Sequence, residues 1–574
     1  MHLRRMLLLI TVPFAIGCRG GVLGGPEPAA GIAADWPFEG KARVTEAPAA
    51  MVVSGHPLAS EIGRDILRAG GNAVDAAVAV GFALAVVHPE AGNLGGGGFM
   101  VIRTAAGEVS TLDYRETAPG RATRDMYLDA NGEPTEQSVT GHLAAGVPGS
   151  VAGLTAAHQK LGRLPFDSVI APAIRLARDG FVVDQYRSES IQSDSARLSS
   201  FPASLATFLP AGRPPAPGST FAQPELGATL EEIRKHGAAG FYQGVVADLI
   251  VAEMERGGGL ITHEDLAAYR AVWREPITIR YRGHTIYSMP PASSGGVTMG
   301  EILNIMEGYH PLPAFGTPAL VHREAEAMRR AFTDRNRHLG DPAFVQNPVE
   351  RLLSKEYAAT LRSEIREQAT PTPRFEPAAT GGSSTTHYSV VDAEGNAVSC
   401  TTTLNESYGS AVTVTGGGFL LNDEMDDFAT APGKPNMYGL VQGEANAIAP
   451  GKRMLSAMTP SLVLDPQGEL FLIVGTPGGP KIITMVYHVI SNVIDHRMTL
   501  PQAVTAPRMH HQALPDSLQV EDDGFTGTTL DSLRARGHAI SFRGTWGDVE
   551  AIIRTAAGWQ GVSDPRRGGG GAGY

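Results

Sequence analysis

The sequence predicts a protein of the α+β class, because patterns typical of buried helices and of β-hairpins occur in the same chain. Ala76–Val87 is small and apolar on every side, as in a buried helix, and a strand pattern follows from Phe99 to Thr104. Two alternating segments, His387–Asp392 and Ala397–Leu404, flank Ala393-Glu394-Gly395, a short connection with glycine last that is typical of a hairpin. A chain of 574 residues, 43% of them hydrophobic, can bury a large core around such elements.

The N-terminal segment predicts export. A basic start, Met-His-Leu-Arg-Arg, precedes an apolar run from Met6 to Ile16 that is too short to span a bilayer, so residues 1–17 fit a secretory signal peptide. Ala15-Ile16-Gly17-Cys18 is similar to a lipoprotein cleavage box, with alanine in place of leucine. A lipid anchor at Cys18, facing the periplasm or the exterior, and an ordinary signal peptide cut later both stay open. Residues 18–49 are expected to form a flexible tether because residues 20–31 are rich in glycine.

Charge, cysteine content and two short motifs exclude several function classes. The net charge is −12 and no basic cluster follows a helix face, so we expect no nucleic-acid partner. With Cys18 removed or lipidated, Cys400 stands alone and no internal disulfide is expected. The glycine run before Phe99 is not followed by Gly-Lys-Ser/Thr, which excludes a phosphate-binding loop. His510-His511 lacks a third ligand at a suitable spacing, and we expect neither a metal nor a cofactor.

The rest of the chain supplies further elements in the same style. Helices are expected at Pro57–Ala69, Asp167–Arg178 and Ile482–Val493, and strands at Tyr281–Met289, on either side of residues 465–468, and at Val412–Thr415 with Phe419–Asn422. Residues 190–225 are rich in Pro, Ser and Ala and predict loops. Residues 371–384 are rich in Pro, Thr, Gly and Ser and predict a mobile segment.

The hairpin register brings two threonines together. The three-residue connection pairs Asp392 with Asn396, and continuing the ladder places Thr385 opposite Thr403. Side chains directly opposite on antiparallel strands have Cβ atoms about 4.5–5.5 Å apart. Threonine is also an ordinary strand residue, so spacing alone favours a structural pair. The alternative is that Thr385 becomes a nucleophile after chain cleavage, because its freed amine can then accept the hydroxyl proton.

The stretch Gly381–Asn405 closely resembles the start of the small subunit of the gamma-glutamyltransferases (glutathione hydrolases), which are N-terminal nucleophile hydrolases. Further blocks are similar to the same family from about Val53 to Tyr574. The resemblance implies a four-layer αββα sandwich built jointly by two subunits from one precursor. Cleavage between Ser384 and Thr385 would give a large subunit, residues 50–384, and a small subunit, residues 385–574, which form a heterodimer.

The resemblance also implies roles for individual residues. Thr385 would be the nucleophile, Thr403 would orient its hydroxyl, and the N–H groups of Gly478 and Gly479 would stabilise an oxyanion. The implied substrate-binding residues are Arg115 and Ser456 for the α-carboxylate, Glu424 and Asp427 for the α-amino group, Asn405, Ala457 at the position of the family's second serine, and Tyr438 on a lid loop. Without the family, Asn422–Asp427 is a solvated acidic turn, Arg115 belongs to a surface ion pair, and the two glycines form a plain tight turn.

The function implied is an exported, self-processing gamma-glutamyltransferase. It would cleave γ-glutamyl amides such as glutathione through an acyl-enzyme on Thr385 and pass the glutamyl group to water or to amino acid or peptide acceptors. A related acylase, acting on glutaryl-β-lactams or on polyglutamate capsule, is the alternative within enzymes. An uncleaved binding or scaffold protein is the alternative outside them. The intact set Thr385, Thr403, Asn405, Gly478 and Gly479 argues against that reading.

Overall fold

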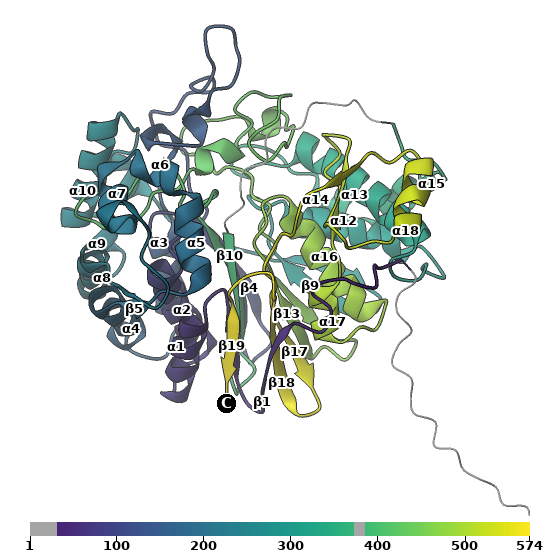
Figure 1. Cartoon of the computed structure of the whole chain (residues 1–574), viewed down its shortest axis with the longest axis horizontal. Helices are drawn as coiled ribbons and strands as arrows, with labels where there is room; N and C mark the ends of the chain where they lie inside the picture. The colour runs from purple at the N-terminus through teal and green to yellow at the C-terminus, as the bar shows by residue number, and fades with distance from the viewer. Residues whose placement is uncertain (1–30, 372–384) are drawn as a thin grey trace, which may run out of the picture.

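A computed structural model describes residues 31–371 and 385–574. The expected signal peptide at residues 1–17, Cys18 and the cleavage residue Ser384 therefore lie outside the described residues, as does nearly all of the segment expected to be mobile. Two sheets of seven strands each lie face to face in the middle of the molecule, with helices on both outer sides (Figure 1). The predicted four-layer αββα sandwich is confirmed.

The first sheet contains the predicted hairpin at its centre. β10 is bonded to β11 on one side and to β2 on the other, and every neighbouring pair in this sheet is antiparallel. In spatial order its strands are β19 (Gly570–Gly573), β2 (Met51–Ser54), β10 (Thr385–Val391), β11 (Ala397–Thr403), β3 (Gly97–Arg103), β4 (Val109–Asp113) and β7 (Val272–Arg274).

The second sheet is also antiparallel and is built mainly from the C-terminal part of the chain. In spatial order its strands are β1 (Arg43–Ala47), β18 (Gly558–Ser563), β17 (Glu550–Thr555), β13 (Leu470–Val474), β12 (Ser461–Leu464), β9 (His284–Ser288) and β8 (Ile277–Tyr281). The smaller sheets are β14 (Met509–His510), β15 (Leu518–Val520) and β16 (Ile540–Phe542), and β5 (Phe181–Val182) with β6 (Thr220–Phe221).

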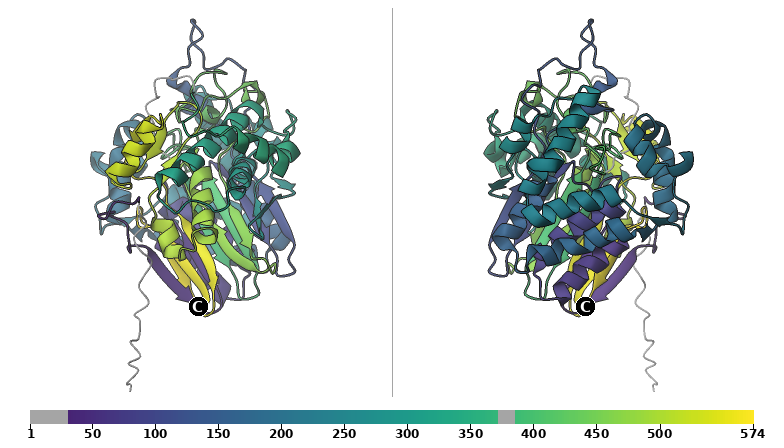
Figure 2. Two further views of the ribbon diagram at one scale, coloured as in Figure 1. Left: turned by 90° about the vertical axis from the view of Figure 1, so that its right-hand side faces the viewer. Right: turned by 90° about the vertical axis from the view of Figure 1, so that its left-hand side faces the viewer.

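Helices cover the outer face of each sheet, as Figures 1 and 2 show from three sides. Beside the first sheet lie α1 (Pro57–Arg68), α2 (Ala73–Val87), α3 (Ser150–Leu161), α4 (Phe166–Asp179), α5 (Gln185–Ser193), α6 (Ser195–Ser199), α7 (Pro202–Phe208), α8 (Pro224–His236), α9 (Ala239–Tyr242), α10 (Gly244–Gly257) and α11 (His263–Ala268). Beside the second lie α12 (Gly295–Glu307), α13 (Pro318–His338), α14 (Val349–Leu352), α15 (Lys355–Ser363), α16 (Lys481–Ile494), α17 (Leu500–Thr505) and α18 (Gly527–Ala535).

The alternation of the central strands divides the core into layers. On β10, Tyr388 and Val390 belong to the apolar cluster shared with α1, α2 and α3, whereas Val391 belongs to the cluster shared with the second sheet, α12, α13 and α16. Because successive strand residues point to opposite faces, one strand contributes to both clusters. α2 is buried along its whole length and begins at a capping box formed by Asn72 and Asp75, so the prediction of a buried helix is confirmed.

The hairpin has the predicted register. The Asp392 N–H donates to the Asn396 carbonyl at 3.0 Å, and Gly395 takes the positive φ of 89° that the turn requires. Continuing the ladder, Thr385 is the partner of Thr403. The register prediction is confirmed to its last pair.

Three segments differ from the sequence predictions. Residues 190–225, expected to be loops, contain α6 and α7, α7 beginning with Pro202 at its first helical position, where proline is favourable. Residues 412–422 are joined only by an isolated bridge between Thr413 and Leu420, not by two strands. Within the expected tether, β1 pairs with β18, and the Trp36 indole N–H donates to the Thr505 carbonyl at 2.7 Å.

Two further observations concern the molecule as a whole. Within the two described ranges, none of the helices is both long and apolar enough for a membrane span. Cys400 is a free thiol buried in β11, where its sulfur lies 3.0 Å from the Tyr114 hydroxyl.

Candidate active site

The two threonines meet at the edge of a pocket between the sheets. The hydroxyl oxygens of Thr385 and Thr403 are 3.2 Å apart, and both side chains are buried. The Asn405 N–H donates to Thr403 Oγ1 at 2.8 Å, so the Thr403 hydroxyl can in turn donate its own proton toward Thr385. The contact brings the two hydroxyl groups within hydrogen-bonding distance of each other.

A single pocket gathers the residues predicted from the sequence. Its lining includes Thr385, Thr403, Arg115, Asn405, Glu424, Asp427, Tyr438, Ser456, Ala457 and Gly479. These residues come from the hairpin, from the loop after β4, from the 3-10 helix η4 (Glu424–Asp427) and from the loops before β12 and α16. Gly478 precedes the lining residue Gly479 but is not itself part of the lining.

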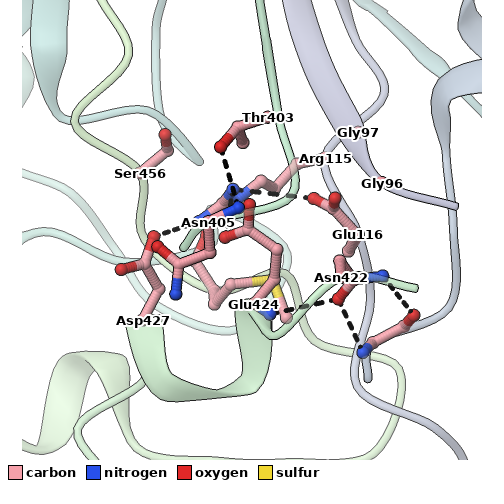
Figure 3. Close-up of polar contacts among 12 residues, drawn as sticks. Gly96, Gly97, Arg115, Glu116, Thr403, Asn405, Asn422, Glu424, Asp427 and Ser456 are labelled. Carbon is pink, nitrogen blue, oxygen red and sulfur yellow. Dashed lines mark hydrogen bonds and ion pairs between the residues drawn. The ribbon is translucent and has the colours of Figure 1, made fainter. Parts of the chain in front are cut away.

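Three carboxylates surround Arg115, as Figure 3 shows. Arg115 Nη1 lies 2.6 Å from Glu424 and 3.5 Å from Glu116, and Nη2 donates to Asp427. Its Nε donates to the Met454 carbonyl at 3.2 Å. Arg115 and Glu424 are fully buried, so neither reading of this region as a surface ion pair or a solvated acidic turn holds. Asp427 and Arg115, which we expect to bind opposite charges of one substrate, contact each other.

Burial changes the titration of this cluster. Loss of solvent raises the pKa of Glu116 to about 8 and raises those of Glu424 and Asp427, although Arg115 opposes all three shifts. The same Coulombic contacts raise the pKa of Arg115 above its usual value. The arginine is therefore a permanent cation for which all three acidic groups compete, and Asp427 is also attracted by Arg335.

Asn405 joins the hairpin to the predicted lid segment. Its backbone has a positive φ of 84°, a conformation that asparagine tolerates better than most residues. The Tyr438 hydroxyl donates to Asn405 Oδ1 at 2.8 Å, and the Tyr438 ring lies against Gly479. Tyr438 thus connects the end of the nucleophile hairpin to the loop before α16.

The glycines before α16 present free N–H groups. Gly478 and Gly479 have φ values of 146° and 55°. In the part of the chain that the structure describes, neither N–H donates a hydrogen bond, and Gly479 lines the pocket together with Thr385. The positive end of the α16 dipole adds to the field at this point. Two N–H groups so placed can stabilise a developing oxyanion.

Ser456 and Ala457 also line this pocket. Ser456 Oγ accepts the Met458 N–H at 3.1 Å, which leaves its hydroxyl proton for a ligand. The Ser456 carbonyl accepts both the N–H and the hydroxyl of Ser294, at 2.8 and 2.6 Å. The Ala457 side chain offers only a methyl group here, as expected from the sequence.

Sequence reasoning missed one contributor. Arg335, on α13, lines the pocket, but its sequence block gave no indication of that position. The glycine run before Phe99 acts through close packing, since a Cβ on Gly96 would lie 2.1 Å from the Thr403 carbonyl oxygen. Glycine there lets β3 approach the strand that carries Thr403. Within residues 31–371 and 385–574, no group of three His, Cys, Asp or Glu side chains is arranged to hold a metal ion.

The family model described as gamma-glutamyltranspeptidase matches residues 59–574. The chain belongs to the gamma-glutamyltranspeptidase family. A glutathione hydrolase proenzyme from Escherichia coli is 46% identical over 90% of both chains, and one from Pseudomonas aeruginosa is 44% identical over 88% of this chain and 91% of its own. The acylase ACY 1 proenzyme of Pseudomonas sp. strain V22 is 40% identical over 85% of this chain and 87% of its own.

Solved structures of related proteins have the same fold. A cephalosporin acylase from Bacillus halodurans aligns with a TM-score of 0.83 at 30% identity, over 94% of this chain and 98% of its own. The gamma-glutamyltranspeptidase of Helicobacter pylori aligns with a TM-score of 0.55 at 46% identity, over 57% of this chain and 94% of its own. Membership of the family and the fold are thus supported by sequence and by structure.

Proposed function

We propose that this gamma-glutamyltranspeptidase family member cleaves γ-glutamyl amides, glutathione among them, with Thr385 as an N-terminal nucleophile. The amine of Thr385 takes the proton of its own hydroxyl, and Oγ1 attacks the γ-carbonyl carbon. The C–N bond of the amide then breaks, and the leaving amine departs with the proton. Water, or the amine of an amino acid or peptide, attacks the resulting ester, regenerates the Thr385 hydroxyl and releases glutamate or a new γ-glutamyl amide.

The site supplies a group for each stage of this reaction. Thr403 orients the nucleophile through the 3.2 Å hydroxyl contact. The N–H groups of Gly478 and Gly479 receive the negative charge of the tetrahedral intermediate. Asn405 and Tyr438 hold the hairpin and the lid together above the reacting group. Proton transfer by a positioned group contributes about 10²- to 10⁴-fold to a rate.

The charged groups select the glutamyl end of the donor. Its α-carboxylate and α-ammonium carry the same two charges as Asp427 and Arg115, which pair with each other. The substrate can therefore replace this pair: its carboxylate binds Arg115, and its ammonium binds Asp427 and Glu424. Ser456 adds a neutral donor to the carboxylate. The observation that carries the proposal is this paired cation and anion in one pocket with the hydroxyl-bonded Thr385.

Maturation requires one cleavage of the precursor. We propose that Thr385 Oγ1 attacks the carbonyl carbon of Ser384, that the Ser384–Thr385 C–N bond breaks, and that the freed amine takes the hydroxyl proton. Water then opens the resulting ester, which gives two chains. The term proenzyme in the names of the bacterial relatives supports this step. We further propose export through residues 1–17 and, as one of two alternatives, a lipid anchor at Cys18.

One experiment tests both activity and maturation. The purified protein is analysed on a denaturing gel, its new N-terminus is sequenced, and hydrolysis of a γ-glutamyl-anilide is followed. We expect two bands, Thr385 as the new terminus, and turnover that is lost in Thr385→Ala. An active protein that stays a single chain would contradict the proposal.

An acylase acting on glutaryl amides is the second candidate, favoured by the likeness to the Bacillus halodurans cephalosporin acylase. Glutaryl compounds lack the α-amino group and would leave Asp427 without its cationic ligand. Comparing γ-glutamyl-anilide with glutaryl-anilide separates the two functions. Turnover of the glutaryl compound at an equal or higher rate would favour the acylase.

A further inference from the structure

Arg335 is a buried cation that makes no ion-pair contact among the described residues, although Asp427, which lines the same pocket, attracts it from a longer distance. It lies in the last turn of α13 and is 1% exposed. Its Nε donates to Ser294 Oγ at 2.9 Å, and its Nη1 donates to Asn336 Oδ1 at 2.8 Å and Gln442 Oε1 at 3.3 Å. All three acceptors are neutral. Burial lowers the pKa of Arg335 to about 10, which still leaves it protonated at neutral pH.

Its neighbours on the same helix behave differently. Arg329 pairs with Glu326 and Asp516, and Arg330 pairs with Glu326. Arg115, which lines the same pocket, is bound by three carboxylates and a carbonyl. A buried charge without a direct ionic contact is costly, so the absence of such a contact at Arg335 needs an explanation.

The unused part of the guanidinium is Nη2. Within residues 31–371 and 385–574 this nitrogen donates no hydrogen bond, whereas Nε and Nη1 are engaged. Arg335 lines the pocket that also contains Thr385, Asp427 and Ser456. The two N–H groups of Nη2 remain available, and a charged N–H donor suits a carboxylate oxygen. The structure thus presents a cationic hydrogen-bond donor in the pocket that Ala457 also lines. Ala457 stands where a serine hydroxyl was expected from the family.

We propose that Arg335 is a specificity-determining residue that binds the α-carboxylate of the γ-glutamyl donor, as a second cation beside Arg115. This inference rests on the proposed function and adds the substrate group that Arg335 recognises. With two cations, the pocket can bind a substrate carboxylate even though it already contains Glu424 and Asp427. The ammonium group of the donor then binds these two acidic residues. Ser294, which receives the Arg335 Nε–H and donates to the Ser456 carbonyl, connects the cation to the serine that binds the same carboxylate.

The test varies the enzyme and the donor together. Hydrolysis of γ-glutamyl-anilide and of its α-carboxamide analogue, in which the carboxylate is replaced by a neutral amide, is measured for the wild type, Arg335→Gln, Arg335→Lys and Arg337→Gln. Arg337 is an exposed arginine two residues away on α13 and serves as the matched loss of charge. Each protein is first examined on a denaturing gel for self-cleavage.

For the charged donor, Arg335→Gln should lower kcat/KM about 10- to 100-fold, mainly through KM, which is the scale of a hydrogen bond to a charged group. The neutral analogue should lose much less, so the preference for the carboxylate shrinks. Arg335→Lys should keep part of the preference for the charged donor, and Arg337→Gln should keep all of it.

If kcat/KM fell equally for both donors, Arg335 would only hold the segment around Ser456 in place, and the proposal would be overturned. Unchanged kinetics in Arg335→Gln would also overturn it. If Arg335→Gln fails to mature, Arg335→Lys carries the comparison, and if neither variant matures the residue is a folding requirement and the proposal falls. Failure of the wild type to hydrolyse γ-glutamyl-anilide would instead contradict the proposed function.

Discussion

The Thr403 hydroxyl lies within hydrogen-bonding distance of the Thr385 hydroxyl, and we propose that it orients that group. Because Thr403 Oγ1 already accepts the Asn405 N–H, its proton is the part that can reach Thr385. Thr403→Ala should therefore lower kcat about 10²- to 10⁴-fold and slow self-cleavage, the scale of a positioned proton-transfer group. Thr403→Ser keeps the hydroxyl and should retain most of the activity. Normal turnover in a correctly cleaved Thr403→Ala protein would contradict this role.

Arg115 and Ser456 should differ sharply in what their loss costs. Losing a buried charged partner costs about 2–5 kcal/mol, whereas losing a neutral hydrogen bond costs about 0.5–1.5 kcal/mol. We expect Arg115→Ala to lower kcat/KM for a γ-glutamyl-anilide far more than Ser456→Ala, and Ala457→Ser to change it only modestly. Arg115→Ala also leaves Glu116, Glu424 and Asp427 without a cation. Similar losses in the two alanine variants would mean that charge does not decide donor binding.

Among the structural elements, β10 and the loop after β13 are separated by one histidine ring. His387 contacts Thr401 Oγ1 at 2.8 Å through Nδ1 and Ser389 Oγ at 3.2 Å through Nε2, so the ring is held on both sides. A Cβ on Gly475 would lie 2.2 Å from the ring. Glycine therefore sets the distance between the nucleophile strand and the loop that carries Gly478 and Gly479.

Gly475→Ala should push this loop away from β10 and lower both stability and kcat. Overpacking of this kind costs about 1–3 kcal/mol. Gly527→Ala, at a glycine with no atom near the added Cβ, is the matched control. Thermal unfolding and turnover of the two variants check the prediction, and equal Tm and kcat values for both would show that the ring can move aside.

Elements with a strong local pattern could be predicted from the sequence, and those without one could not. The hairpin and α16 have a clear apolar period, and α2 is apolar on every side and begins at the capping residue Asn72. The helices α6 and α7 are only 5 and 7 residues long, too short to show an apolar stripe. Arg335 illustrates the limit for the site: its place in the pocket lining, with no carboxylate in contact among the described residues, is a property of its neighbours in space, which no spacing along the chain contains.

At the scale of the whole molecule, the proposed cleavage before Thr385 would cut a chain whose two parts are interleaved. In the first sheet, β10 and β11 lie between β2 and β3, which come from the other side of the cut. In the second, β12 pairs with β9 and β18 with β1 in the same way. Both sheets and both apolar clusters therefore need both chains.

Self-cleavage should thus break the covalent chain without changing the size of the folded molecule. In native buffer the matured protein should elute at the same volume as an uncleaved Thr385→Ala precursor, although a denaturing gel separates it into two bands. Removal of either chain would expose three strand edges in the first sheet and two in the second, so we expect both chains to unfold in one cooperative transition rather than one after the other. Size-exclusion chromatography and denaturant titration check this. A small chain, Thr385 to Tyr574, that elutes alone without denaturant would show that the interleaved sheets do not hold the subunits together.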